Sequence, residues 1–570
     1  MKIIHLPQSP WLLSDRPDLF TVRLWAEPGL VSSCRLLYSD PYDYLQGRDK
    51  QLNWSEAGME LLARNDDYEV WSCRVSVPTQ KLSYLFEVLD KDGNRLWLGQ
   101  DGLSGRQENT GIFRTGYHFG EDRLPSWTGK SVWYQVFPDR FSGGSSDGVF
   151  TPSATNFWGG TLEGIRQHIP YLQGIGVTGL YLNPVFSSPS NHRYDTLDYT
   201  QVDSRLGTNE SLVRLAEELH RNHIKLMLDG VFNHASDQCR FFRDVKERGE
   251  YSPYRDWFII HDLDSTMNEP TGALTPERMR TDPPYECFAF AANMPKWNTG
   301  HPEVQEYLIG AAENWTRQLN LDAWRLDVPD EVSPEFLRLF RRRMRTVNPE
   351  ILILGEIWTD PSAWTQTGLF DGTMDYPLYH AVSRFLLQNC TDAYTFCNAM
   401  NRRQGIMTNE MLRNQMIFLG NHDLPRCLTL ADHDLEKVKA AWLLLCLLDG
   451  KLNLYYGDEQ ALTGGQDPAN RGVMRWEESE NDSDMMSFVT KTVSLRKQLQ
   501  SSFISEMRFE AFSADTALLE MTRGDKRYIF CMYASDHDNE DLRIAGKPLL
   551  KGKHFKLWEV AGNSSPVLPE

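Results

Sequence analysis

Two charged residues that lie two positions apart in a strand-like segment mark the first place where this chain could do chemistry. Residues 324–328 read WRLDV, and because side chains alternate along a strand, Arg325 and Asp327 share one face. Such charges are costly to bury unless the strand end meets a wet cleft. There, the guanidinium would lower the pKa of Asp327 and keep it ionised. The pattern indicates a carboxylate nucleophile, with a structural ion pair as the alternative.

Further polar residues follow other strand-like segments. Glu356 comes after the apolar run 351–355, Asp423 closes the fragment GNHD at 420–423, and His234 closes DGVFNH at 229–234. Each fragment alone is weak, because Gly-Glu is more often a turn and Asn-His-Asp more often a cap. Together, three carboxylates with an arginine and two histidines fit cleavage of a glycosidic bond by two carboxyl groups.

The elements that must position these residues alternate between strands and helices from residue 131 onward. Such alternation is typical of βα units around a parallel sheet. The candidate strands are 131–137, 177–183, 225–229, 323–328, 351–356, 372–376, 415–419 and 451–456. Eight of them predict an α/β fold, a TIM (β/α)8 barrel, whose active sites lie at the carboxyl ends of the strands. An open doubly wound sheet is the alternative.

The rest of the chain predicts three further units. Short alternating runs separated by turn residues predict an N-terminal β-sandwich over 1–122. The catalytic barrel is expected over 123–502, and the long connection 235–299 after its third strand is expected to be an insert domain. Residues 503–570 return to β-like runs and predict a C-terminal β domain.

Composition limits the class of partner. The net charge of −19 argues against nucleic acid and anionic membranes and is compatible with a neutral ligand. No apolar run is long enough to cross a bilayer, and the start of the chain does not have the pattern of a signal peptide. The nine cysteines form no C-x-x-C pair, which fits a reducing compartment. We therefore expect a cytoplasmic protein.

With these fragments in place, the chain resembles the α-amylase family of glycoside hydrolases. Four short family signatures occur in order as DGVFNH, WRLDV, GEIW and GNHD, beginning at residues 229, 324, 355 and 420. The resemblance implies that Asp327 is the nucleophile, Glu356 the general acid/base and Asp423 the stabiliser of the transition state. The segment YQVFPDRF at 134–141 and the N-terminal β module are similar to the cyclomaltodextrinase, neopullulanase and maltogenic amylase group.

The same resemblance implies a set of substrate-binding residues. Some match residues that hold the sugar at the cleavage subsite, namely His192, Tyr194, His234, Arg325 and His422. Asp467 and Arg471, in the loop GGQDPANRGVMRW at 464–476, would bind the non-reducing end. Trp297 stands in MPKWN at 294–298, which resembles the group's insert signature, usually written with Leu at that position.

The chemistry implied is hydrolysis with retention. Asp327 would attack the anomeric carbon while protonated Glu356 protonates the leaving oxygen, and water would then reverse both steps. Glu356 must hold its proton better than Asp327, helped by the neighbouring carboxylates and by an apolar wall such as Trp358. Glu331 could favour water over an acceptor sugar as the attacking group. The alternative, which has equal weight, is that Glu331 is only a solvated charge in a loop.

The expected function is an α-glucan hydrolase that cleaves α-1,4-glucosidic bonds in cyclodextrins, pullulan or maltodextrins, with transglycosylation as an open second outcome. The alternatives are a small-substrate α-glucosidase or glycosyl-transferring barrel enzyme, and a non-catalytic amylase-like binding protein. No cofactor is expected. The family's calcium loop is eroded, because residues 142–148 read SGGSSDG and the next turn reads GGT at 159–161, which leaves too few oxygen ligands. We also expect a homodimer through residues 1–122.

Overall fold

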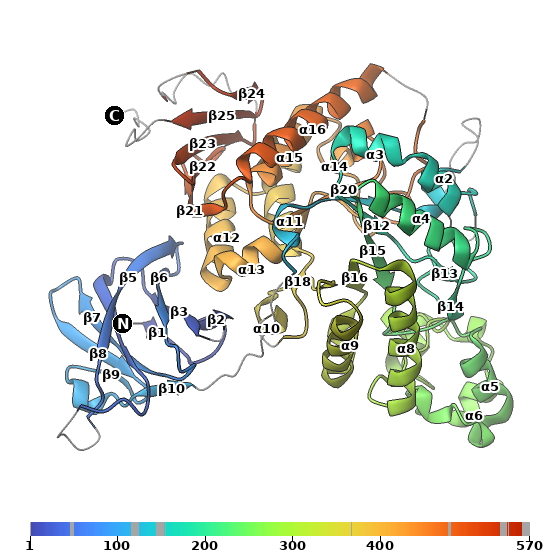
Figure 1. Ribbon diagram of the computed structural model, residues 1–570, viewed down its shortest axis with the longest axis horizontal. Helices are drawn as coiled ribbons and strands as arrows, with labels where there is room; N and C mark the ends of the chain where they lie inside the picture. Colours follow the sequence, from blue (N-terminus) through green and yellow to red (C-terminus); the bar gives the residue numbers. More distant parts are fainter. Residues whose placement is uncertain are drawn as a thin grey trace.

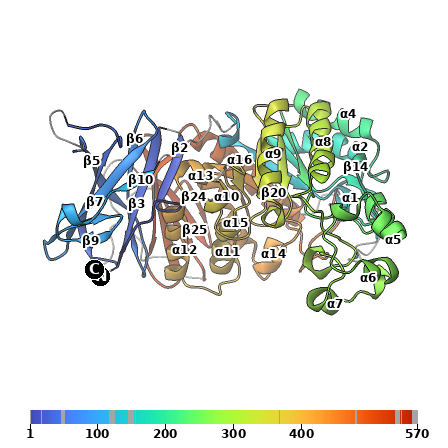
Figure 2. The same ribbon diagram turned by 90° about the horizontal axis from the view of Figure 1, so that it is seen from below.

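The structure is a computed structural model of the whole chain (Figure 1). It describes residues 2–560 apart from residue 17 and the segments 46–50, 116–124, 144–152, 154–155, 366–367, 477–479, 536–543 and 545–546. The N-terminal β domain and the helices of the insert lie at opposite ends of the molecule, with the barrel between them (Figures 1 and 2).

The N-terminal domain is antiparallel β structure. Its strands are β1 (Ile3–Ile4), β2 (Leu12–Arg16), β3 (Leu19–Ala26), β4 (Val31–Ser39), β5 (Ser55–Arg64), β6 (Glu69–Ser76), β7 (Leu82–Asp90), β8 (Arg95–Gly99), β9 (Gly102–Ser104) and β10 (Phe113–Thr115). The first half of β5 pairs with β4 and its second half pairs with β6. This strand therefore joins the two parts of the domain around one apolar core, which includes Val22, Leu36 and Phe86.

The centre of the chain forms a closed parallel barrel, as predicted. Its strands are β11 (Val132–Val136), β12 (Gly179–Leu182), β15 (Lys225–Gly230), β16 (Ala323–Leu326), β17 (Leu352–Gly355), β18 (Gly372–Thr373), β19 (Met416–Phe418) and β20 (Lys451–Tyr455). They are paired in the order β18-β17-β16-β15-β12-β11-β20-β19, and a parallel bridge between Met374 and Met416 joins the two ends. The alternative of an open sheet is therefore wrong.

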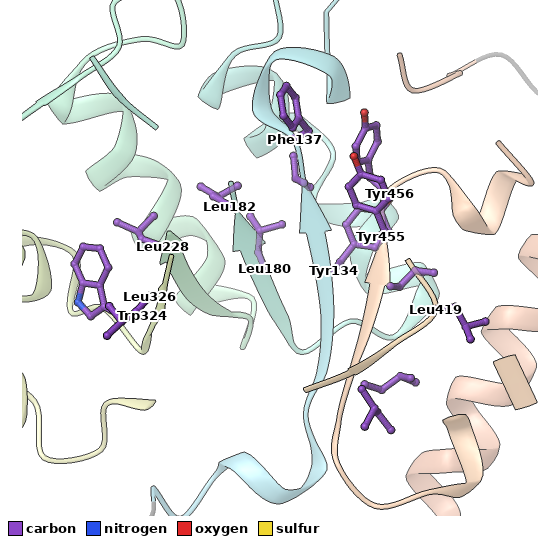
Figure 3. Close-up of a cluster of buried hydrophobic side chains, with 14 of the residues drawn as sticks. Tyr134, Phe137, Leu180, Leu182, Leu228, Trp324, Leu326, Leu419, Tyr455 and Tyr456 are labelled. Carbon is purple, nitrogen blue, oxygen red and sulfur yellow. The ribbon is translucent and has the colours of Figure 1, made fainter. Parts of the chain in front are cut away.

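Alternation along the strands sorts the side chains into two layers. Trp133, Tyr181 and Met227 belong to a cluster inside the barrel, whereas the intervening positions belong to the layer beneath the helices. Figure 3 shows this outer layer, with Leu228, Trp324 and Leu326 side by side. Because Trp324 and Leu326 point outward, Arg325 between them must point into the barrel.

Helices cover the outside of the barrel. They are α1 (Pro138–Phe141), α2 (Leu162–Gln167), α3 (Ile169–Ile175), α4 (Asn209–Arg221), α8 (Pro302–Leu319), α9 (Pro334–Val347), α10 (Ser362–Thr365), α11 (Tyr376–Val382), α12 (Ala393–Ile406), α13 (Asn409–Asn414), α14 (Cys427–Leu430), α15 (Leu435–Leu447) and α16 (Glu480–Leu499). Local sequence explains individual boundaries. The Thr208 side chain accepts a hydrogen bond from Ser211 N at the start of α4, which satisfies a free helix-start amide.

The connection between β15 and α8 contains α5 (Arg240–Arg248), α6 (Leu263–Asn268) and α7 (Pro276–Thr281). Isolated bridges from His234 to Lys296 and from Phe258 to Trp297 hold this insert together and anchor it at the strand end. A separate short hairpin, β13 (Phe186–Ser187) with β14 (Asp198–Val202), follows β12. The hairpin was not anticipated, because its first strand is only two residues long.

The chain ends in an antiparallel sheet of β21 (Ile504–Ala511), β22 (Thr516–Arg523), β23 (Lys526–Tyr533), β24 (Leu550–Gly552) and β25 (Phe555–Val560). The architecture therefore agrees with the predicted fold class. The exact domain limits at residues 122, 502 and 235–299 stay predictions. In the described parts of the chain, no helix is long and apolar enough to cross a membrane.

The N-terminal domain is fixed to its own barrel. The buried guanidinium of Arg23 donates hydrogen bonds to Gly405 O at 2.7 Å and to Met407 O at 2.6 Å. These carbonyls end α12, where a positive charge also interacts favourably with the helix dipole. Leu13 packs beside them against Met407 and Met411.

Candidate active site

The strand register brings the predicted residues to one end of the barrel. Asp229 on β15 lies beside Arg325 on β16, which lies beside Leu354 on β17. Asp327 and Glu356 directly follow the last residues of β16 and β17. The carboxyl ends of neighbouring parallel strands therefore place all of these side chains at one mouth of the barrel.

Arg325 is the centre of this group and is fully buried. Its Nη1 donates to Asp229 Oδ1 at 2.7 Å and to Asp327 Oδ1 at 2.8 Å. Its Nη2 lies 2.8 Å from Glu356 Oε2. One guanidinium therefore holds three carboxyl groups from three successive strands, and two of them are the predicted catalytic pair. We refer to Asp229, Arg325, Asp327 and Glu356 as the strand-end cluster.

The pKa of Asp327 departs from the sequence prediction. Burial raises this pKa well above its ordinary value, and repulsion from Glu356 and Asp229 adds to the rise. Arg325 acts in the expected direction, but its charge is shared among three carboxyl groups. The predicted lowering of the Asp327 pKa is therefore wrong. Because each ionised carboxyl disfavours ionisation of the next, the cluster favours a state that holds a proton.

Two aromatic side chains also hold the Glu356 carboxyl. Trp358 Nε1 donates to its Oε1 at 3.2 Å, and the Tyr376 hydroxyl donates to the same oxygen at 3.3 Å. The indole of Trp358 stacks on the Tyr376 ring at 3.9 Å and remains 44% exposed. Trp358 therefore meets Glu356 through a polar hydrogen bond, and its role as an apolar wall stays a prediction. Its open face is available for a sugar ring to stack on.

The backbone at Val328 is unusual. Val328 has φ 42°, a left-handed conformation that is strained for a β-branched residue. In this conformation the amide of Val328 donates to Glu356 Oε2 at 3.2 Å. The predicted strand 323–328 therefore ends at Leu326, because the chain turns at once to direct Asp327 and the next amide into the cluster.

His422 and Tyr194 form a second group beside Asp229. Their rings stack at 5.2 Å, and the Tyr194 hydroxyl forms a short hydrogen bond with His422 Nε2. Tyr194 also donates to Asp229 Oδ2 at 2.9 Å. Burial, together with Arg325 and Arg471, lowers the pKa of His422 well below its ordinary value. His422 is therefore a neutral hydrogen-bonding group at neutral pH.

Asp423 lies at the edge of the same mouth. Its Oδ2 is 3.3 Å from His422 Nε2, and its Oδ1 is 3.4 Å from Arg471 Nη2. Arg471 also contacts Asp467 at 3.3 Å. Burial raises the pKa of Asp423 despite the attraction of Arg471. His192, whose pKa burial lowers to about 4, accepts a hydrogen bond from Tyr194 N at 3.1 Å.

Two predicted binding residues lie deeper than expected. Trp297 is only 2% exposed, and its indole donates to the Tyr199 hydroxyl at 3.0 Å. The structure therefore places Trp297 in the core beneath the insert, where its ring is too deeply buried to contact a sugar directly. His234 is also buried, stacked on Phe288 at 4.8 Å, and burial lowers its pKa to about 3. Its Nε2 has no hydrogen-bond partner among the described residues.

Glu331 is not an isolated loop charge. Its Oε2 accepts hydrogen bonds from Lys296 Nζ at 3.0 Å and from Asn233 Nδ2 at 3.2 Å. The side chain remains 42% exposed. The three residues connect the end of β15, the insert and the segment after β16, so Glu331 lies at the rim of the mouth with its carboxylate held in place.

Sequence reasoning missed several supporting groups. The strand predicted over 372–376 includes Tyr376, but β18 is only two residues long and Tyr376 begins α11. Gln135 and Asn183 lie inside the barrel mouth, where Gln135 Nε2 contacts His422 Nδ1 at 3.0 Å. The available signal was a polar residue at an inward position of an otherwise apolar strand, which Gln135 in β11 satisfies.

Tyr376→Phe should lower kcat/KM roughly tenfold, the effect of losing about 1.4 kcal/mol of transition-state stabilisation. The change removes the hydroxyl that donates to Glu356 and that accepts from Asn421 Nδ2 at 3.0 Å. Steady-state kinetics on a maltodextrin, with Tyr251→Phe at an 86% exposed position as the control, measure this effect. Unchanged kinetics would show that the phenol does not position Glu356.

The predicted loss of the calcium site falls largely outside the described residues, since the structure describes only Ser142 and Gly143 of that loop. Metal that binds only the folded state raises the melting temperature. We therefore expect the melting temperature to be the same after treatment with a chelator. A clear drop that calcium reverses would contradict the prediction, and differential scanning calorimetry of treated and untreated protein decides it.

Comparison with known proteins agrees with this geometry. The model of the alpha amylase catalytic domain matches residues 135–521, and the model of the alpha amylase N-terminal ig-like domain matches residues 1–119. The closed barrel and the two matches define a multidomain barrel glycosidase. The chain belongs to the alpha-amylase family of glycoside hydrolases.

Individual relatives place it beside one group of that family. The chain is 36% identical over 512 residues to neopullulanase 2 of Thermoactinomyces vulgaris, covering 88% of this chain and 84% of the relative. It is 34% identical over 517 residues to the intracellular maltogenic amylase of Bacillus subtilis (strain 168), covering 87% and 84%. A solved structure of a cyclomaltodextrinase superposes with a TM-score of 0.85 at 29% identity, covering 98% of each chain.

Proposed function

We propose that the protein hydrolyses α-1,4-glucosidic bonds of cyclodextrins, pullulan or maltodextrins with retention of configuration. The observation that carries the proposal is that Asp327 and Glu356 contact two nitrogens of one buried guanidinium. Carboxyl groups gathered this closely favour the nucleophile and acid/base pair of a retaining enzyme, because an inverting enzyme leaves room for a water between them.

In the proposed reaction, Asp327 attacks the anomeric carbon and Glu356 gives its proton to the leaving oxygen. A glycosyl–Asp327 ester forms, and Glu356 then removes a proton from the water that hydrolyses it. The first step requires Asp327 to be ionised and Glu356 to carry the proton. Asp423 would stabilise the positive charge that develops on the sugar.

The remaining residues would bind substrate. Arg471 and Asp467 lie at one edge of the mouth with Asp423, where they suit the non-reducing sugar. Trp358 offers an exposed ring on the side of Glu356. Glu331, held by Lys296, is placed to direct water or an acceptor hydroxyl. Tyr194, His192 and His422 would line the subsite of cleavage.

Two relatives, 34% and 36% identical to this chain, are named as a maltogenic amylase and a neopullulanase, and these names support the proposed substrate class. The test is a time course of products from β-cyclodextrin, pullulan and soluble starch, with the anomeric configuration followed by NMR. Ring opening of β-cyclodextrin to α-configured maltodextrins supports the proposal. Release of glucose from small glucosides alone would favour the alternative of an α-glucosidase, and a product of inverted configuration would exclude the mechanism.

We also propose that the protein is a cytoplasmic homodimer that pairs through its N-terminal domain. Its cysteines form no disulfide among the described residues, and one relative is named an intracellular enzyme. Two-fold pairing is the commonest way to satisfy a spare domain surface. Light scattering tests this part, and a monomer at micromolar concentration would exclude the dimer.

A further inference from the structure

A large cavity in the described part of the protein lies away from the strand-end cluster. It is a cleft of about 1700 Å³ between the N-terminal domain, α12 and the C-terminal sheet, and we call it the interdomain cleft. Figure 1 shows β5 and β6 below α12, with β21 and β22 above it. No member of the strand-end cluster lines the cleft. Its volume exceeds that of a usual small-molecule pocket.

Hydrogen bonds at the cleft hold its walls together. Asn398 Nδ2, on α12, donates to Asp66 Oδ2 of the N-terminal domain at 2.6 Å. Asn401 Nδ2 donates both to Arg64 O at 2.9 Å and to Phe509 O of β21 at 3.2 Å. One asparagine thus joins three domains, so the cleft has a preformed shape.

An unsatisfied amide lies in the wall of the cleft. Gln404, in the last turn of α12, lines the cleft and is only 5% exposed. Its Nε2 has no hydrogen-bond partner in the described part of the chain. A buried donor without a partner destabilises the free protein. A ligand oxygen at this position would accept a hydrogen bond from Gln404 Nε2. The unpaired amide therefore points to a ligand in the cleft.

The other groups of the cleft suit a polyhydroxylated ligand. In the described chain β21 is an edge strand, paired only with β22. Because Phe509 O faces α12, strand alternation turns the backbone groups of Met507 to the same side. Tyr394 and Leu61 add apolar surface at 50% and 43% exposure. Edge amides and carbonyls can bond hydroxyls while a ring packs on the tyrosine.

Charge argues against an ionic ligand. Acidic and basic side chains that line the cleft are nearly equal in number, and some of them neutralise one another. Arg508 pairs with Glu510 at 3.2 Å, and Arg527 pairs with Glu520. A surface of this kind gives no strong field to attract a polyanion or a polycation. Amides, a phenol and paired charges fit a neutral oligosaccharide.

We propose that the interdomain cleft is a second, non-catalytic binding site for a linear α-glucan chain. This inference rests on the proposed function for the identity of the sugar. It adds a site whose occupant touches the N-terminal domain, α12 and the C-terminal sheet at once. The site would hold a long substrate on the enzyme while the strand-end cluster cleaves another part of it.

Hydrogen exchange of the Asp327→Asn variant with and without maltoheptaose tests the site, since this variant should bind the sugar without consuming it. We expect sugar to protect segments 394–404 and 504–511 in addition to the strand-end segments. Tyr394→Ala should remove the protection at the cleft alone, whereas Tyr251→Ala should leave it. Protection confined to the strand-end segments would overturn the proposal. The proposal would also be overturned if protection of 504–511 increased with protein concentration in the absence of sugar, because the occupant of the cleft would then be a second copy of the chain.

Gln404→Leu separates a binding role from a structural one. If the unpaired amide awaits a ligand, the variant should have a higher melting temperature than the parent and weaker sugar protection at the cleft. A lower melting temperature with unchanged protection would assign Gln404 to the fold and overturn its role. Hydrolysis of maltotriose by otherwise wild-type Tyr394→Ala should be unchanged. If the wild type hydrolyses no glucan at all, the proposed function fails, independently of protection at the cleft.

Discussion

Asp327→Asn and Glu356→Gln should each lower kcat by about a hundredfold or more, the usual contribution of a nucleophile or a general acid/base. Both changes keep the shape of the side chain, so the fold should survive. An asparagine amide in place of Asp327 could not form the ester, and a glutamine amide in place of Glu356 could not protonate the leaving oxygen. The loss should appear in kcat more than in substrate affinity, because these roles are needed only in the transition state.

The measurement is steady-state kinetics with β-cyclodextrin, alongside calorimetry of each variant. Asp330→Asn, three residues after the proposed nucleophile, provides a matched control, since Asp330 makes no contact with Arg325 among the described side-chain interactions. Retention of more than a few per cent of the wild-type rate by either variant would remove that residue from the mechanism. A variant that fails to bind the substrate would also contradict the assignment.

Much of the fold could be predicted because the barrel depends on patterns that are local in sequence. Most of the barrel strands are short apolar runs followed by a polar fragment, so strand number, strand ends and site position follow together. The prediction failed where an element has few residues of its own. β18 has two residues and α11 begins three positions later, so the prediction of one strand over 372–376 is wrong.

Properties that depend on how many side chains share one partner in the folded protein could not be predicted in the same way. The spacing of Arg325 and Asp327 correctly indicated an ion pair, but one arginine serves three carboxyl groups. The number of charges around Arg325 is set by the register between neighbouring barrel strands. Two of these residues, Asp229 and Arg325, are 96 positions apart in sequence. Burial then decides the direction of the Asp327 pKa. Likewise, Trp297 belongs to a motif, but only packing against Tyr199 shows its depth.

The role of Arg325 leads to the second large effect. Arg325→Leu should destabilise the barrel by about 3–5 kcal/mol at neutral pH, the usual cost of removing one partner from a buried ion pair. The leucine fills part of the space but leaves Asp229, Asp327 and Glu356 without their common cation. Activity should also be lost, since the guanidinium orients the proposed catalytic pair.

The loss of stability should depend on pH with a definite sign. Burial already raises the pKa values of Asp229 and Asp327, and removal of the positive charge raises them further. A folded-state pKa above the unfolded value means that the folded protein binds more protons in that interval, so its stability falls as pH rises through it. The deficit of Arg325→Leu should therefore be largest at neutral pH and should shrink as pH falls toward the unfolded-state pKa of aspartate.

Urea denaturation followed by tryptophan fluorescence, at neutral and at mildly acidic pH, measures this difference. Arg166→Leu on α2 is the control, because its ion pair with Glu163 is exposed to solvent and should contribute little. A deficit for Arg325→Leu that does not change with pH would mean that lost packing, not uncompensated charge, causes it. Because leucine restores most of the apolar contacts of the arginine stem, the electrostatic cause predicts that acid relieves the greater part of the damage.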